Sequence, residues 1–259
     1  MTPTTMQVRI PVDGTEAVQG TIVAAPTSLP GVLIVHGWDS DQAHYQIRAE
    51  DLAALGCVCM TFDLRGHGRR GDLKATVSRA DNLRDVLAAF DLLAGQASVD
   101  PAAMALIGTS YGGYLAAIAS AEREVRWLAL RVPAPYPDDG WNVPKQQLDR
   151  AAIRAYREKV QPPESDRALA ACLAFRGDVL VVGSDCDRLV PREGIASYVR
   201  AFQAARSITH RMIAGADHGL SDERSQRTYD ALLSGWLTEM ILGARTPDTH
   251  ERPAAAPAR

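Results

Sequence analysis

Short apolar runs alternate along the chain with segments whose apolar residues recur at helical spacing. The runs at 31–35 (GVLIV), 57–62 (CVCMTF) and 179–183 (VLVVG) are almost uninterrupted, which is typical of strands buried on both faces of a sheet. Further strands are predicted at 7–12, 20–25, 103–108, 125–132 and 208–213. Helices are predicted at 45–55, 82–93, 114–121, 195–202 and 229–241.

This repeated alternation of strand and helix predicts the fold class. It favours an α/β protein with a mostly parallel central sheet of about eight strands and helices on both faces. We expect residues 1–242 to form a single domain. Ligands of such sheets bind at the carboxyl ends of the strands, so residues that directly follow a predicted strand are the first candidates for a functional site.

Two segments depart from the alternation. Residues 133–175 open with the proline-rich stretch PAPYPDDGWNVP and continue with two short helix-like stretches, the longest connection between predicted strands. We expect this segment to form a small cap or a wall of a substrate pocket. Residues 243–259 are rich in proline, alanine and charge, a composition that predicts a disordered tail.

Composition and charge narrow the class of protein. The 259 residues are 46% hydrophobic and 23% charged, with a net charge of −3, which is ordinary for a soluble globular protein. Neither a nucleic-acid partner nor a membrane is expected, because no basic stripe and no apolar run of spanning length occurs. The first residues lack the pattern of a signal peptide. The four cysteines are expected to be reduced, so we expect the protein to be cytoplasmic.

No cofactor site is evident in the sequence. Histidine, cysteine and acidic residues do not cluster at the spacing of metal ligands. No G-x-G-x-x-G or Walker-type loop occurs either. We therefore expect neither a metal nor an organic cofactor.

Ser110 lies between two glycines where a predicted strand turns into a predicted helix. A nucleophilic serine must project from a sharp turn, and small neighbours such as Gly108 and Gly112 let strand and helix approach closely. The helix N-terminus would direct backbone N–H groups at developing negative charge. The alternative interpretation is a glycine-rich turn that carries an inert serine.

A base and an orienting carboxylate follow Ser110 in the chain. Asp187 comes just after the predicted strand 179–183, and His218 just after the predicted strand 208–213. A serine nucleophile needs a base, and the base needs a carboxylate that fixes its orientation. We therefore expect Ser110, Asp187 and His218 to be the catalytic residues. Asp185 is a competing candidate for the acid, and Asp217 is expected to be a loop residue.

The loop after strand 31–35 carries His36, Gly37 and Trp38. We expect the backbone N–H groups of Trp38 and Tyr111 to form an oxyanion hole, and His36 to organise this loop. The side chains of Trp38, Tyr111 and Trp141 are expected to line the substrate pocket.

These features resemble the α/β-hydrolase superfamily, and especially its dienelactone hydrolase-like and prolyl oligopeptidase-like serine hydrolases. The resemblance covers roughly residues 20–242 and rests on GTSYGGYLA (108–116), HGW (36–38), FDLRGHG (62–68), DRLVP (187–191) and ADHGL (216–220). The chain differs from dienelactone hydrolase itself, which uses a cysteine nucleophile where Ser110 stands here. It also lacks the His-Gly-Gly run of many lipases.

The motifs and the resemblance together predict a serine hydrolase that cleaves a carboxylic ester of a small molecule through an acyl-enzyme. A peptidase for small peptides or aminoacyl groups, or a thioesterase or acyltransferase, would carry the same motifs. A non-catalytic ligand-binding protein could keep the fold but would not need all three residues. The sequence leaves open whether the protein is a monomer or a homodimer.

A cluster of basic residues follows the predicted strand 57–62. The cluster comprises Arg65, His67, Arg69, Arg70 and Lys74. The simpler interpretation is a solvated surface loop, and the sharper one is that the loop attracts an anionic substrate.

Overall fold

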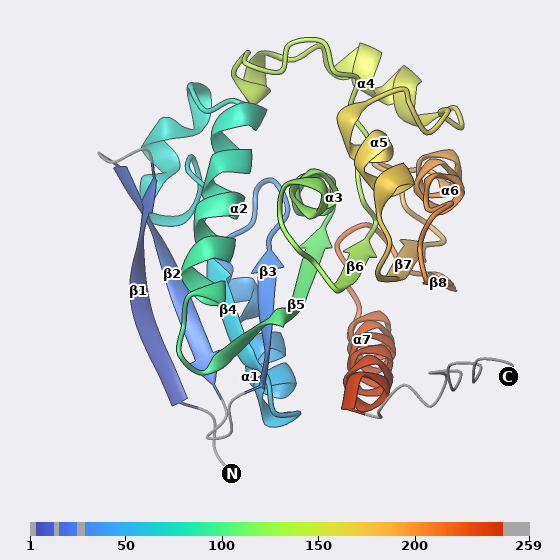
Figure 1. Cartoon of the computed structure of the whole chain (residues 1–259). Helices are drawn as coiled ribbons and strands as arrows, with labels where there is room; N and C mark the ends of the chain where they lie inside the picture. The colour runs from blue at the N-terminus through green and yellow to red at the C-terminus, as the bar shows by residue number, and fades with distance from the viewer. Residues whose placement is uncertain (1–3, 13–15, 25–28, 246–259) are drawn as a thin grey trace, which may run out of the picture.

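The fold is built on an eight-stranded sheet with strand order β1-β2-β4-β3-β5-β6-β7-β8 (Figure 1). The structure is a computed structural model that describes residues 4–12, 16–24 and 29–245. The strands are β1 (Thr4–Val12), β2 (Glu16–Ala24), β3 (Leu29–Val35), β4 (Val58–Phe62), β5 (Val99–Thr109), β6 (Trp127–Arg131), β7 (Asp178–Ser184) and β8 (Ser207–Ile213). The prediction of a mostly parallel sheet of eight strands is confirmed.

Only the first strands run antiparallel. β1 pairs with β2 and β2 with β4 in antiparallel register, and every pair from β4 to β8 is parallel. In the central strands Thr109 pairs with Arg131, and Arg131 pairs with Val182. The carboxyl ends of β5, β6 and β7 therefore meet at one edge of the sheet, as the fold class requires.

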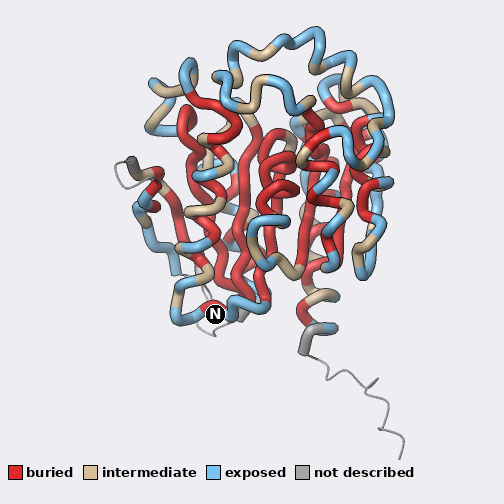
Figure 2. Tube along the Cα trace, turned by 45° about the horizontal axis from the view of Figure 1, so that its top comes forward, coloured by how far each residue is buried: buried red, intermediate tan, exposed pale blue. Residues whose placement is uncertain are grey.

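Helices cover both faces of this sheet (Figure 1). The α-helices are α1 (Gln46–Ala54), α2 (Arg79–Ala94), α3 (Tyr111–Glu122), α4 (Arg150–Arg157), α5 (Arg167–Ala174), α6 (Arg192–Ala201) and α7 (Glu223–Arg245). One apolar cluster joins α2, α3, α5 and α6 to the sheet, and a second joins α1 and α7 to it. Both clusters are buried around the central strands (Figure 2). Among the described helices, none combines the length and apolarity that a membrane span requires.

Residues 133–175 pass over the carboxyl ends of the strands and carry α4 and α5 (Figure 1). Arg79, at the start of α2, is fully buried and donates hydrogen bonds to the carbonyls of Pro137 (2.7 Å) and Asp139 (2.5 Å). Its guanidinium also lies 5.7 Å from the ring centres of Tyr136 and Trp141. This cation fastens the segment, hereafter the strap, to the start of α2.

Several helices begin earlier than the sequence predicts: α3 begins at Tyr111, α6 at Arg192 and α7 at Glu223. α2 begins at Arg79 rather than near residue 82, because Ser78 and Asp81 form a capping box. α7 continues to Arg245, and the rest of the predicted tail, residues 246–259, lies outside the described residues.

The expectation of a solvated basic loop is wrong for Arg65 and His67, which are both buried. The Arg65 side chain reaches α2, where its Nε lies 2.6 Å from Asp85 Oδ1. Asp85 also accepts a hydrogen bond from the Arg65 backbone N–H (2.8 Å). The loop after β4 is therefore held inward by a buried ion pair and does not present all its charges to a ligand.

Removing the carboxylate of this ion pair should destabilise the protein. We expect Asp85→Ala to lower the free energy of unfolding by about 3–5 kcal/mol, because it takes away the negative charge against a buried guanidinium. The matched control is Asp91→Ala on the same helix, whose ion pair with Arg123 is exposed, and which should cost less than about 1 kcal/mol. Urea unfolding measures both, and equal losses would contradict the assignment.

Candidate active site

Ser110 occupies the turn between β5 and α3 in a strained backbone conformation, with φ 55° and ψ −114°. The turn is tight because a Cβ added at Gly108 would lie 2.5 Å from the carbonyl oxygen of Gly112. A Cβ at Gly112 would lie 2.3 Å from the carbonyl oxygen of Val35. The Ser110 backbone N–H donates to the carbonyl of Arg131 (2.9 Å). The surrounding backbone thus fixes the strained residue and leaves its hydroxyl at the sheet edge.

The three residues expected to act together are joined by hydrogen bonds. His218 Nε2 lies 2.9 Å from Ser110 Oγ, and His218 Nδ1 lies 2.6 Å from Asp187 Oδ2. The Asp187 side chain is 1% exposed, and its Oδ1 accepts from the backbone N–H groups of Leu189 (2.7 Å) and Val190 (2.9 Å). The backbone hydrogen bonds to Oδ1 therefore fix the carboxylate independently of the imidazole. Through Oδ2 the carboxylate holds the ring with Nε2 towards the serine.

Neither the competing candidate Asp185 nor the neighbouring Asp217 forms a hydrogen bond with the His218 ring. Asp185 forms an ion pair with Arg192, and Asp217 accepts hydrogen bonds from Ser221. The physical reason is the turn after β7, which directs Asp185 to the surface and Asp187 inward.

The loop after β3 lies directly against Ser110. A Cβ added at Gly37 would lie 3.5 Å from the Ser110 Cβ. His36 holds this loop, since its Nδ1 hydrogen donates to the Gly37 carbonyl (2.7 Å) and its Nε2 accepts from the Leu64 N–H (3.0 Å). Burial lowers the pKa of His36, consistent with a neutral ring that both donates and accepts.

Lys145 in the strap was not singled out from the sequence. Its Nζ lies 3.8 Å from the Trp38 ring centre, 4.8 Å from that of Tyr111 and 5.6 Å from that of Tyr136. Burial lowers the pKa of Lys145, against the opposing effect of Tyr136. The ammonium therefore stacks on the indole, and Trp38 offers less open ring surface to a ligand than the sequence suggests.

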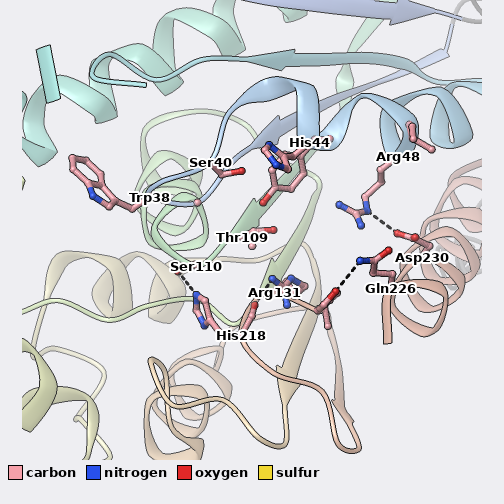
Figure 3. A pocket seen from close by; sticks show the side chains of 15 residues that line it. Trp38, Ser40, His44, Arg48, Thr109, Ser110, Arg131, His218, Gln226 and Asp230 are labelled. Carbon is pink, nitrogen blue, oxygen red and sulfur yellow. Dashed lines mark hydrogen bonds and ion pairs between the residues drawn. The ribbon is translucent and has the colours of Figure 1, made fainter. Parts of the chain in front are cut away.

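A cavity of about 380 Å³ opens beside Ser110 between α1, the loop after β3, the end of β6 and α7 (Figure 3). Its lining residues are Gly37, Trp38, Ser40, His44, Tyr45, Ile47, Arg48, Thr109, Ser110, Arg131, His218, Gly219, Leu220, Gln226 and Asp230.

Two of the three predicted pocket side chains do not line this cavity. The ring of Tyr111 is fully buried, and its hydroxyl donates to Asn82 Oδ1 (3.1 Å). Trp141 lies in the strap, where the guanidinium of Arg167 stacks 3.8 Å from its ring centre. Only Trp38 borders the cavity, and Figure 3 shows its ring directed away from the arginines. The aromatic rings contact one another and the strap instead of forming the cavity wall.

Sequence reasoning also missed the charged residues of the cavity. Arg48 comes from α1, Arg131 from the end of β6 and Asp230 from α7. For Arg131 a signal was available, because it lies at the carboxyl end of the predicted strand 125–132, and the other candidates directly follow such ends. Arg48 and Asp230 lie within helices, where nothing in the sequence distinguishes them from surface charges.

Comparison with known sequences gives a family and one relative. Residues 29–166 match the profile of the family described as serine aminopeptidase, S33. Over 104 residues, 40% of this chain, the sequence is 34% identical to an uncharacterized protein found in two strains of Mycobacterium tuberculosis. The match spans 36% of the length of that relative.

Solved structures share the fold at low sequence identity. A dienelactone hydrolase from Anabaena variabilis is 18% identical with a TM-score of 0.64, over 92% of this chain and 99% of its own. A thermostable carboxylesterase from a metagenomic library is 21% identical with a TM-score of 0.68, over 93% and 90%. An acylaminoacyl peptidase from Pyrococcus horikoshii is 14% identical with a TM-score of 0.72, over 93% and 42%.

Low pH should destabilise the protein through His67, a buried histidine beside Trp38. The His67 ring packs edge-on against the Trp38 ring, with 4.5 Å between the ring centres, and burial, with smaller contributions from His36 and Lys74, lowers its pKa to about 3. The unfolded chain binds a proton below about pH 6.5 while the folded chain does not, so stability falls with decreasing pH. We compare the loss in free energy of unfolding between neutral pH and pH ~4.5. This loss should be about 2 kcal/mol smaller in His67→Gln than in the wild type.

Urea unfolding at a series of pH values measures this difference. His44→Gln, which alters an exposed histidine, is the control and should keep the pH dependence of the wild type. An unchanged pH dependence in His67→Gln would contradict the prediction.

Proposed function

Because the chain belongs to the serine aminopeptidase family S33, whose fold is that of the α/β-hydrolases, we propose that it cleaves a carboxylic ester of a small molecule through an acyl-enzyme. The observation that carries this proposal is the continuous hydrogen-bonded chain from Ser110 through His218 to the buried Asp187. A nucleophile, a base and an orienting carboxylate in contact are what acyl transfer to serine requires.

In the first step, His218 Nε2 accepts the hydroxyl proton as Ser110 Oγ attacks the acyl carbon. Asp187 keeps the other ring nitrogen protonated and stabilises the imidazolium that forms. We assign the backbone N–H groups of Trp38 and Tyr111 to the oxyanion. Each such donor lowers the barrier by about 3 kcal/mol. The Tyr111 N–H is suited to this role because it is the first of α3 and has no intrahelical acceptor.

The imidazolium then gives its proton to the leaving alcohol, and the acyl-serine remains. Water attacks the acyl carbon with His218 again as the base, which releases the acid and restores Ser110. The cavity beside Ser110 has room for a small substrate and for this water.

The second candidate function is a peptidase, favoured by the description of the family. An aminopeptidase must hold the protonated α-amine of its substrate, which requires an available carboxylate close to the nucleophile. Asp230 is the sole carboxylate among the described lining residues, and it is already paired with Arg48 (2.7 Å). The charge of the cavity therefore favours the ester hydrolase.

Loss of the serine hydroxyl should abolish ester hydrolysis. We expect the wild type to cleave p-nitrophenyl esters within the series from acetyl to decanoyl, and Ser110→Ala to lower kcat by about four orders of magnitude or more. The matched control is Ser120→Ala on the same helix, whose hydroxyl bonds only within the helix, and which should retain activity. Absence of wild-type activity across the series, with the protein folded, would refute the proposal.

An α-ammonium group should reduce the rate of cleavage. To correct for intrinsic reactivity, each kcat/KM is divided by the rate of alkaline hydrolysis of the same ester. We then expect the value for methyl propionate to be at least about tenfold higher than that for alanine methyl ester, because the cavity already holds an excess of cations. Alaninamide should be cleaved far more slowly than either ester. A kcat/KM for alaninamide that rivals the esters would identify a peptidase instead.

A further inference from the structure

Arg131 is a buried cation that forms no ion pair with any carboxylate of the described residues. The residue is 6% exposed, and its Nη2 donates to the His218 carbonyl (2.7 Å). Its Nη1 is buried and has no hydrogen-bond acceptor within the described residues. No described carboxylate oxygen comes within the 4.0 Å of an ion pair with it. It also faces the Tyr229 ring, whose centre lies 5.7 Å from the guanidinium carbon.

Burying the Arg131 guanidinium without an anion costs desolvation free energy that its present contacts offset only in part. Burial lowers the pKa of Arg131, but an arginine in a protein keeps its proton, so it cannot escape the cost by becoming neutral. Buried charges are normally paired or hydrogen-bonded. The π-face of Tyr229 compensates only part of the charge. The guanidinium thus has capacity for one further acceptor.

A second guanidinium faces the same cavity. Arg48 donates through Nε to Asp230 (2.7 Å), and none of the described residues accepts a hydrogen bond from either of its Nη groups. Its guanidinium carbon lies 4.9 Å from the ring centre of Tyr229, the ring that Arg131 also faces. Figure 3 shows Arg48 and Arg131 pointing into the cavity that contains Ser110 and His218.

The charge and the volume of the cavity indicate which chemical group of a ligand would pair with the two arginines. Two arginines and one aspartate give the described lining residues a net charge of +1, and Asp187 acts on Arg131 only from beyond ion-pair distance. A carboxylate supplies one negative charge and two oxygens in a plane, which matches the planar donor fork of a guanidinium. The volume of about 380 Å³ suits a small organic acid.

We infer that the substrate is a small ester with a free carboxylate, which accepts hydrogen bonds from the Nη groups of Arg131 and Arg48 while its ester carbonyl lies at Ser110. This inference rests on the proposed function. Half-esters of dicarboxylic acids would carry the carboxylate on the acyl part, and acylated hydroxy acids would carry it on the leaving group. In both classes the charge anchors one end of the substrate and places the scissile bond at the nucleophile.

Matched pairs of esters test the inference. Monoethyl glutarate is compared with ethyl butyrate for the acyl side, and p-acetoxybenzoate with phenyl acetate for the leaving-group side. We expect the charged member of at least one pair to have a kcat/KM at least about tenfold higher than its neutral counterpart. Arg48→Gln should lower that ratio by about tenfold, and Arg48→Lys should restore part of it. The control is Arg224→Gln, which removes an exposed charge from α7 outside this cavity and should leave the ratio unchanged.

Failure of the inference is distinguishable from failure of the proposed function. Ester hydrolysis that depends on Ser110 but shows equal kcat/KM within both pairs overturns the carboxylate site and leaves the hydrolase standing. If no ester is cleaved, binding of glutarate measured by calorimetry decides. Binding that is lost in Arg48→Gln supports the site without the hydrolase, and absence of binding overturns it. Binding of inorganic phosphate with no binding of glutarate also overturns the assignment to a carboxylate.

Discussion

The contact between the first turn of α3 and the ends of β3 and β5 is made by backbone against backbone. No side chain fits at Gly108 or Gly112, because their nearest neighbours are backbone atoms and, at Gly108, the Ala116 Cβ, none of which can rotate aside. This contact forces Ser110 into its strained conformation and brings the loop after β3 next to it. The serine, the first N–H of α3 and the oxyanion loop therefore take their positions from one close approach, and the remaining site residues are arranged around it.

Much of this arrangement can be predicted from the sequence, because it depends only on the strand pattern and on the residues at the strand ends. Buried parallel strands are apolar runs, and their carboxyl ends must meet, so chain order suffices to bring Ser110, Asp187 and His218 together. Their catalytic role stays a proposal. The same rule applied to every strand end would have included Arg131, the last residue of β6.

The rest could not be predicted because it depends on partners distant in the sequence. A run of basic residues after β4 resembles a surface loop, yet Arg65 is buried by Asp85, which lies on another element. Trp141 and Lys145 occupy a strap whose path is fixed by long-range contacts such as those of Arg79. Hydrophobic periodicity contains no information on such cation–ring and ion-pair contacts, so it could not show that the Tyr111 and Trp141 rings lie apart from the cavity beside Ser110 while Trp38 borders it.

The position of Arg131 has a consequence for how such a protein can change its specificity over generations. Its side chain lines the cavity, its carbonyl holds the backbone of Ser110, and its register is fixed between Thr109 and Val182. An insertion or deletion there would shift a central strand and displace the nucleophile, so the residue can be exchanged but not moved. Loops diversify readily by gaining or losing length. In this cavity, position 131 on β6 can therefore change only by point substitution. Position 48 on α1 is less constrained.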